Sequence, residues 1–179
     1  MTGVRDLLPG EYAVLGLLSE RPLHGYELAR LYKAEGLHDA CPVEQSLLYA
    51  YLRNLEDRGF VEATEERVGR RPPRRQFRLT AEGGQAFERW LQAPVNRMRD
   101  VRLDFLIKLY FLQRFDPPAA VELIQKQIAA CDAYLERWQP APDATPFRKL
   151  VAQSKQSAAR ATREWLAAYE RELTEAART

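Results

Sequence analysis

The chain has few of the residues on which metal and redox chemistry depend. Its 179 residues include two cysteines and two histidines, and Cys41 and Cys131 lie too far apart to match a zinc or redox motif. We therefore expect reduced, buried thiols and no metal or cofactor. The histidines, His24 and His38, belong to no Cys/His or Ser/His arrangement, and a glycine-rich phosphate loop is missing. The sequence thus predicts a protein that is not an enzyme.

Long apolar runs are also missing from the sequence. No stretch approaches the roughly 20 apolar residues that span a bilayer, and MTGVRDLLPGEYAVLGLLSE lacks the basic start and the small-residue cleavage site of a secretion signal. We expect a cytoplasmic protein without a membrane partner. The composition, 46% hydrophobic and 29% charged residues, is that of an ordinary globular protein, and the length allows two compact parts.

Three short helical patterns occupy the first part of the chain. Two of them, PGEYAVLGLLSERP and PLHGYELARLYKAEG, are bounded by proline and glycine. The third, CPVEQSLLYAYLRNLEDRGF, places Leu48, Leu52 and Leu55 on one face. We therefore expect three helices in quick succession.

The pattern changes after the third helix. FVEAT and QFRLT alternate apolar and polar residues as strands do, and VGRRPPRR stands between them. Five arginines fall between Arg70 and Arg78, although the net charge of the chain is only +2. The two prolines prevent a regular ladder in this long connection. The sequence predicts a β-hairpin with a basic loop, followed by a fourth helix that Thr80 caps.

The remainder is helical in pattern. RDVRLDFLIKLYFLQRF is apolar nearly all round, which predicts burial on several sides, and two further helices begin after Asp116 and Thr145. Their apolar seams, at steps of three and four, are Val121, Ile124, Ile128, Cys131, Leu135 and Trp138, and then Phe147, Val151, Ser154, Ala158, Ala161, Trp165 and Ala168. The seams need each other or a second copy of the chain, so we expect a homodimer formed through the C-terminal helices.

These elements predict a mainly α fold. Three helices, a two-stranded β-wing and a closing helix form a winged helix-turn-helix DNA-binding domain over residues 1–95, and a C-terminal helical dimerisation domain covers residues 96–179. In such a domain the third helix enters the major groove, while the wing reaches phosphates or the neighbouring minor groove.

Candidate DNA contacts on the third helix lie opposite its leucines. Gln45 and Arg53 can pair with the edges of adenine and guanine, whereas Ser46 and Tyr49 suit phosphates or water-mediated contacts. The alternative is a merely solvated face. His24, at the entry of the second helix, either caps that helix or meets a phosphate.

The wing supplies a second set of candidate contacts. Guanidinium groups grip phosphate oxygens through several donors, and we expect this role for Arg70, Arg71, Arg74 and Arg75. Arg78 lies on the returning strand, outside the contact. A winged helix that binds only protein is the alternative, although such a module needs no arginine-rich wing.

The same residues resemble the PadR-type transcriptional regulators. EYAVLGLLSERPLHGYEL, VEQSLLYAYLRNLEDRGFVEA and GRRPPRRQFRLTAEG follow that family's order: an apolar first helix, a Gly-Tyr-Glu second helix, a recognition helix with a tyrosine, and an arginine-rich wing. The resemblance implies a homodimeric repressor of a pseudo-palindromic operator in double-stranded DNA, often released by a small molecule. Leu47 stands where the family usually has a small hydroxyl residue, so the resemblance does not imply the operator sequence.

Aromatic residues offer a candidate effector pocket. Trp90, Tyr110 and Phe111, with Trp138 and Trp165, could line a cavity in which a small aromatic effector stacks. The alternative is that each of them is an ordinary core or seam residue.

Overall fold

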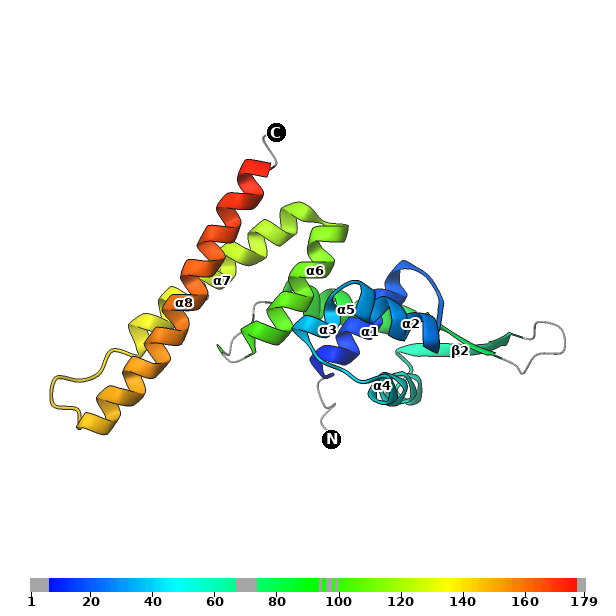
Figure 1. Cartoon of the computed structure of the whole chain (residues 1–179), viewed down its shortest axis with the longest axis horizontal. Coiled ribbons are helices and arrows are strands. Elements are labelled where there is room, and N and C mark those ends of the chain that lie inside the picture. Colours follow the sequence, from blue (N-terminus) through cyan, green and yellow to red (C-terminus); the bar gives the residue numbers. More distant parts are fainter. Residues whose placement is uncertain (1–6, 67–73, 94, 96–97, 99, 177–179) are drawn as a thin grey trace. The chain divides into compact units, whose positions relative to one another are not determined.

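The structure is a computed structural model that describes residues 7–66, 74–93, 95, 98 and 100–176 (Figure 1). These residues form two compact units. The first comprises the described residues up to Ala93 together with Arg102–Lys108, and the second comprises the rest. The boundary between residues 95 and 96 stays a prediction of the sequence.

The first unit is built around its first helix. Helix α1 is buried along most of its length, and it packs against α4 and α5. The fully buried Ala13, Val14, Leu15 and Leu17 occupy the centre of the core. The helices of this unit are α1 (Pro9–Glu20), α2 (Gly25–Ala34), α3 (Leu37–Ala40), α4 (Gln45–Asp57) and α5 (Ala81–Gln92). All were expected except α3, a single turn that follows Gly36 in the left-handed conformation.

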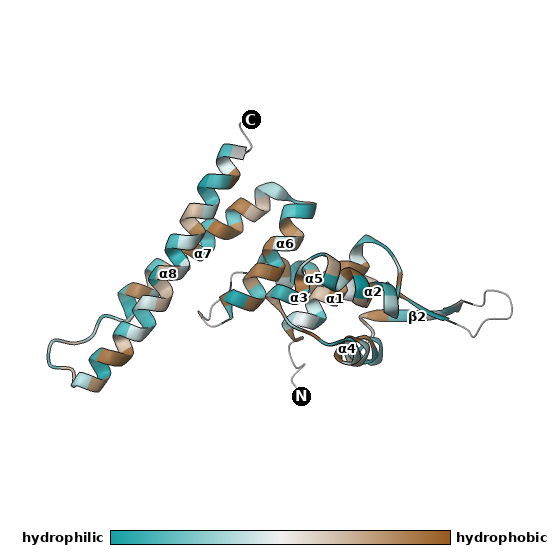
Figure 2. Ribbon diagram, in the orientation of Figure 1, coloured by the Kyte–Doolittle hydropathy of each residue, from teal (hydrophilic) through white to brown (hydrophobic). Residues whose placement is uncertain are grey.

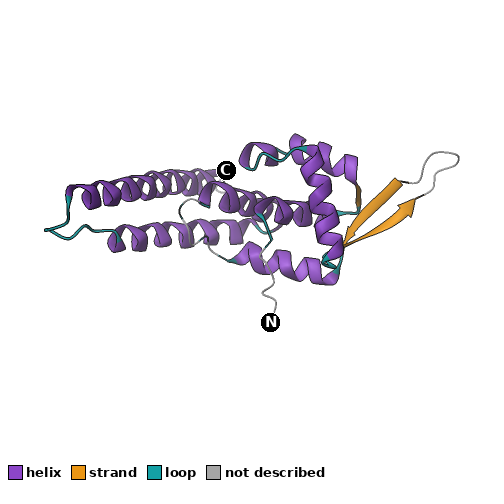
Figure 3. Ribbon diagram, turned by 90° about the horizontal axis from the view of Figure 1, so that it is seen from below, coloured by secondary structure: helices purple, strands orange, loops and turns teal. Residues whose placement is uncertain are grey.

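The predicted hairpin is present, and it belongs to a sheet of three strands. Strands β2 (Val61–Glu66) and β3 (Arg74–Leu79) pair antiparallel as a hairpin (Figure 3). Strand β1 (Leu23–His24) pairs with the other edge of β3, giving the order β1-β3-β2. Strand β1 was not predicted, because two residues are too few to show an alternating pattern. It ties the start of α2 to the base of the wing.

The turn from the hairpin into α5 is closely packed. The Thr80 hydroxyl oxygen accepts a hydrogen bond from the Gly83 backbone N–H at 3.0 Å, which confirms the predicted cap. A Cβ atom on Gly83 would lie 2.1 Å from the carbonyl oxygen of Phe60. Only glycine allows the backbone of α5 to approach the start of the wing this closely.

The rest of the described chain is helical, as expected. A π-helical turn, Val101–Phe105, leads into α6 (Leu106–Phe115), which is followed by α7 (Pro117–Arg137) and α8 (Pro146–Ala176). Figure 2 shows α6 as largely hydrophobic, whereas α8 is mostly hydrophilic with scattered apolar residues. None of the described helices is both long and apolar enough to cross a bilayer.

Helices α7 and α8 pack against each other as a hairpin. The Asp116 carboxylate accepts a hydrogen bond from the backbone N–H of Ala119 and caps α7, as predicted. The buried amide of Gln127 holds the segment before α6: it accepts from the backbone N–H of Val95 at 3.2 Å and donates to the Val95 carbonyl at 3.1 Å. The backbone of Val95 is thereby fastened to α7.

The seam of α8 within the chain differs from the predicted one. Its buried residues are Ala152, Gln156, Ala159 and Leu166. The predicted seam lies mainly on another face, where Phe147 is 72% exposed and Trp165 is 42% exposed. Alanines occupy both faces of α8, so the three-four pattern fits either of them. The consequence is an apolar stripe on α8 that is largely exposed to solvent in the described chain.

Candidate nucleic-acid interface

The rotation of α4 about its axis decides which side chains face solvent. Leu48, Leu52 and Leu55 are buried in the core, as predicted. Gln45, Ser46 and Arg53 are exposed. The structure therefore turns these three candidate residues outward on one helix, and their contacts with DNA stay a prediction.

A buried carboxylate fixes α4 against α1. Glu11, in the first turn of α1, is almost completely buried. Its carboxylate accepts a hydrogen bond from the Asn54 side-chain amide at 2.5 Å and another from the Leu8 backbone N–H at 2.7 Å. A buried carboxylate needs such partners: the bond from Leu8 caps α1, and the bond from Asn54 holds α4 against α1. Sequence reasoning missed it, since no local pattern relates residues 11 and 54.

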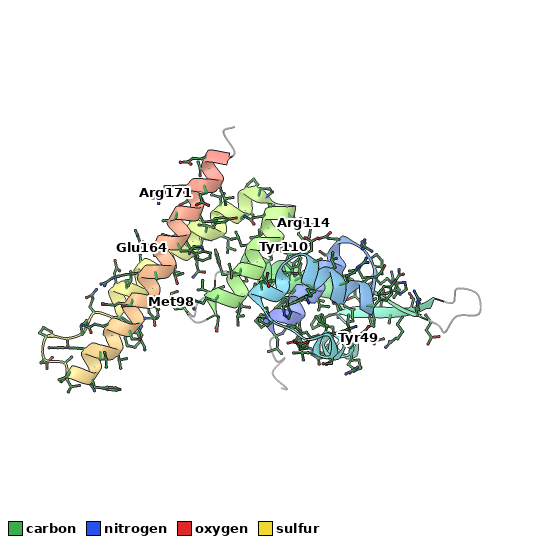
Figure 4. All side chains as sticks on the ribbon, viewed as in Figure 1. Tyr49, Met98, Tyr110, Arg114, Glu164 and Arg171 are labelled. Atoms are coloured by element: carbon green, nitrogen blue, oxygen red, sulfur yellow. The ribbon has the colours of Figure 1, made fainter. Side chains whose placement is uncertain are left out.

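Tyr49 lies at the edge of the exposed face, where α4 meets α2 (Figure 4). The side chain is half-buried, and its ring lies against the backbone of Gly25. A Cβ atom at residue 25 would come within 2.5 Å of the ring carbon Cε1 of Tyr49. The glycine of the Gly-Tyr-Glu signature thus provides the space against which the ring of Tyr49 packs. Packing already accounts for part of Tyr49's role.

His24 connects the second helix to the wing. Its backbone N–H donates to the carboxylate of Glu27 at 2.9 Å, so the cap of α2 uses the glutamate of the signature. The ring nitrogen Nδ1 of His24 lies 3.2 Å from the carbonyl oxygen of Arg75, and the ring stacks on Tyr26 with centroids 5.8 Å apart. A phosphate contact by His24 stays a prediction.

The described arginines of the wing have different surroundings. The guanidinium of Arg74 lies over the ring of Tyr26, 5.6 Å from its centroid. Arg75 forms an ion pair with Glu56 at 2.5 Å, and Arg78 forms one with Glu62, its partner across the hairpin, at 2.5 Å. Arg70 and Arg71 fall outside the described residues.

Leu47 and two basic residues of α2 also lie on the surface that the exposed residues of α4 form. The sequence did not predict them as DNA contacts. Leu47 is 42% exposed on the first turn of α4, beside Gln45 and Ser46. A groove of about 620 Å³ opens between α2 and the start of α4, and its lining includes Arg30 and Lys33. Single basic residues on a helix give no signal in a sequence, because most of them are merely solvated.

The aromatic residues of the predicted effector pocket lie in both units. In the first, Trp90 stacks on Tyr12 with centroids 4.4 Å apart, and the Nζ atom of Lys108 lies 4.7 Å from the centroid of the Trp90 ring. In the second, Tyr110 and Phe111 meet edge to face at 4.8 Å. These contacts are those of ordinary packing, and the effector pocket stays a prediction.

Two features of the first unit concern titratable groups. The ammonium of Lys108 donates to the backbone carbonyl of Ala93, just after α5, and burial lowers the pKa of Lys108 to about 8. Burial also raises the pKa of the Cys41 thiol, which is only half-buried. Within the described part of the chain, no three histidine, cysteine or carboxylate side chains gather as metal ligands would.

Elements and side chains together define a winged helix-turn-helix unit. Residues 14–89 match the family model described as "Transcriptional regulator PadR-like family", and residues 101–174 match "Virulence activator alpha C-term". Over residues 14–89, the winged-helix unit is therefore similar to the PadR-like family of transcriptional regulators.

Individual relatives are similar to this chain over most of its length. The "Negative transcriptional regulator PadR" of Bacillus subtilis (strain 168) is 28% identical over 145 residues, which cover 81% of this chain and 76% of the relative. Bacillus subtilis PadR in complex with operator DNA has 25% identity and a TM-score of 0.47, with 91% of this chain and 98% of that chain covered. A PadR-like regulator from Bacillus cereus has 26% identity and a TM-score of 0.43, with coverages of 96% and 99%. The similarity to the family rests on the match over residues 14–89 and on the winged-helix elements.

Proposed function

We propose that this protein is a PadR-type transcriptional regulator that represses transcription by binding an operator in double-stranded DNA. The observation that carries the proposal is the polar outer face of α4, held in a fixed rotation next to the wing of a PadR-like domain. The name of the Bacillus subtilis relative, a negative regulator, supports repression rather than activation. Since the target is the chromosome, we place the protein in the cytoplasm.

The residues divide by role. Gln45 and Arg53 read base edges in the major groove, and Ser46 contacts phosphate. Arg74, with Arg70 and Arg71, neutralises phosphates at the wing. Arg53→Ala should relax the preference at one base pair by roughly 1 to 3 kcal/mol.

We further propose that two copies of the chain associate through α8. An apolar stripe runs along the exposed face of this helix: Phe147, Leu150, Ser154, Ala158, Ala161 and Trp165. Its small central residues allow close approach of a partner helix, and burial of its large apolar side chains supplies the driving force. A two-fold symmetric dimer presents two recognition helices, which is why the operator should be a pseudo-palindrome.

A small aromatic effector completes the proposal. Trp90, Tyr110 and Phe111 remain the candidate residues, since aromatic rings favour stacking with a flat ligand. Titration with phenolic acids and aromatic cations, followed by tryptophan fluorescence, tests this part. If the fluorescence is not quenched at high ligand concentration, the effector proposal is wrong, whereas the proposal of DNA binding is unaffected.

Selection of binding sites from random duplexes tests the main proposal. We expect two related half-sites, with centres about one helical turn or a multiple of it apart. Affinity for random duplex should fall steeply with salt, because phosphate contacts release counterions. A flat salt response with no selected sequence would contradict DNA recognition and leave a protein-binding module.

A further inference from the structure

Arg75 and Glu56 connect the wing to the recognition helix. The Nη2 atom of Arg75 lies 2.5 Å from the Oε1 atom of Glu56, across 19 residues of sequence. Glu56 stands in the last turn of α4, where the backbone N–H groups of Arg58 and Gly59 close the helix end on the carbonyls of Asn54 and Glu56. The carboxylate is therefore carried by a well-ordered helix end.

The position of Arg75 on its strand explains why it reaches this carboxylate. Side chains alternate along a strand, so Arg75 lies on the same face as Phe77, which is buried in the core. The guanidinium lies 5.3 Å from the centroid of the Phe77 ring. The backbone carbonyl of Arg75 is in turn 3.2 Å from the ring of His24 on the neighbouring strand. Arg74 belongs to the opposite face and lies over Tyr26.

We propose that Arg75 is a positioning residue, which sets the wing against the end of the recognition helix through Glu56, and not a phosphate contact. The inference rests on the proposed DNA-binding function and assigns a role to two residues of that site. A guanidinium paired with a carboxylate is neutral as a unit, so it releases no counterion from DNA. Its contribution is to the angle between two DNA-reading elements, and hence to specificity.

The arginine of the pair is half-exposed, at 48%, and the glutamate is 29% exposed. Exposed ion pairs couple their partners weakly, by up to about fivefold in an equilibrium constant. We therefore expect effects of about two- to fivefold on the ratio of specific to random binding. Folding should be little affected, since the pair lies outside the buried core.

The test compares the salt dependence of binding to random duplex among four proteins: wild type, Arg75→Ala, Arg74→Ala and Glu56→Gln. The plot of log K against log salt has a negative slope, and the magnitude of this slope decreases by about 0.9 for each phosphate that the protein no longer neutralises. We expect that decrease for Arg74→Ala and an unchanged slope for Arg75→Ala. The Glu56→Gln variant frees the guanidinium of Arg75 to meet a phosphate. For this variant, both the magnitude of the slope and the affinity for random duplex should increase.

Specificity supplies the second readout. Against the selected operator, Arg75→Ala and Glu56→Gln should lower the ratio of specific to random affinity by similar factors, and the double variant should be no worse than either single one. Arg74→Ala should weaken both affinities alike. Circular dichroism and thermal unfolding establish whether each variant is folded. If Arg75→Ala does not fold, Glu56→Gln alone tests the ion pair.

Two results would overturn the inference. One is a slope for Arg75→Ala that falls as much as that for Arg74→Ala. The other is a Glu56→Gln variant with unchanged slope and specificity. If the wild type itself binds duplex DNA without any salt dependence, the proposed function fails before the variants are compared.

Discussion

At the scale of single residues, Leu47 is a large apolar side chain exposed on α4. Leu47 is 42% exposed on the first turn of the proposed recognition helix, and exposure of an apolar side chain to water is unfavourable. The apolar group that the major groove offers is the C5-methyl of thymine. We therefore expect Leu47 to contact a thymine methyl in each half-site.

Replacing the operator thymines one at a time by deoxyuridine removes the methyl group alone. For the wild type, we expect one position per half-site to lose about 0.8 kcal/mol, the value of one buried methylene, or roughly fourfold in affinity. The Leu47→Ala variant should be insensitive to the same substitution. If no uracil weakens binding of the wild type, Leu47 does not read thymine.

Gly25 is the second residue with a sharp expectation. An alanine there would place its Cβ 2.5 Å from Cε1 of Tyr49, so the ring or helix α2 must shift. We expect Gly25→Ala to destabilise the fold by about 1 to 3 kcal/mol, as overpacking does, and to weaken operator binding. Urea unfolding and a binding titration measure both effects.

Gly84 in α5 offers the matched control. The nearest atom to a Cβ there is 3.7 Å away, an ordinary contact. Because alanine favours a helix over glycine by about 1 kcal/mol, Gly84→Ala should leave stability unchanged or raise it. Equal losses in the two variants would show that Tyr49 does not depend on Gly25.

At the scale of elements, Lys108 joins the start of α6 to the end of α5. Its pKa is lowered by burial from 10.5 to about 8, so at a pH between these values the unfolded chain binds more protons than the folded chain. Folding stability should therefore rise with pH across that window. Below about pH 8 the burial of a charged ammonium costs its full amount.

A Lys108→Met variant isolates this effect. We expect the unfolding free energy of the wild type, minus that of the variant, to grow between about pH 8 and 10.5, by roughly 1.4 kcal/mol for each unit of pKa difference. Urea unfolding at several pH values gives this difference. A pH-independent difference would mean that Lys108 titrates as an exposed lysine.

The elements also show how far the sequence leads. The helices of the first unit other than α3, and the two strands of the wing, follow from apolar periodicity and from glycine and proline at their ends. Strand β1 does not, because its two residues carry no pattern. The sequence did not show which face of α8 packs within the chain, since Ala152 and Ala159 on one face resemble Ala158 and Ala161 on the other.

The candidate interface was predictable in part. The outward face of α4 follows from three buried leucines. The partners that hold it do not, because Glu11 and Asn54, and likewise Glu56 and Arg75, are distant in sequence and form their contacts only in the folded chain. The sequence shows the charge of the wing as a cluster, whereas the use of each arginine depends on tertiary neighbours.

At the scale of the whole molecule, the stripe on α8 predicts the state of association. Trp165→Glu places a charge in the proposed dimer seam, so we expect a monomer by light scattering and weaker binding to the full operator. Gln153→Glu, on an exposed site of the same helix, should remain dimeric. A dimeric Trp165→Glu variant would place the association elsewhere.

The hydrogen bonds between Gln127 and Val95 bear on how such regulators can be recombined. A chimaera that joins this winged helix to the helices of another regulator should take residue 95 together with α7, because a foreign segment at position 95 need not place its backbone N–H and carbonyl where the buried amide of Gln127 meets them. The exchangeable module therefore begins before Val95. Chimaeras that keep this rule should fold, while those that cut between residues 95 and 127 should be less stable.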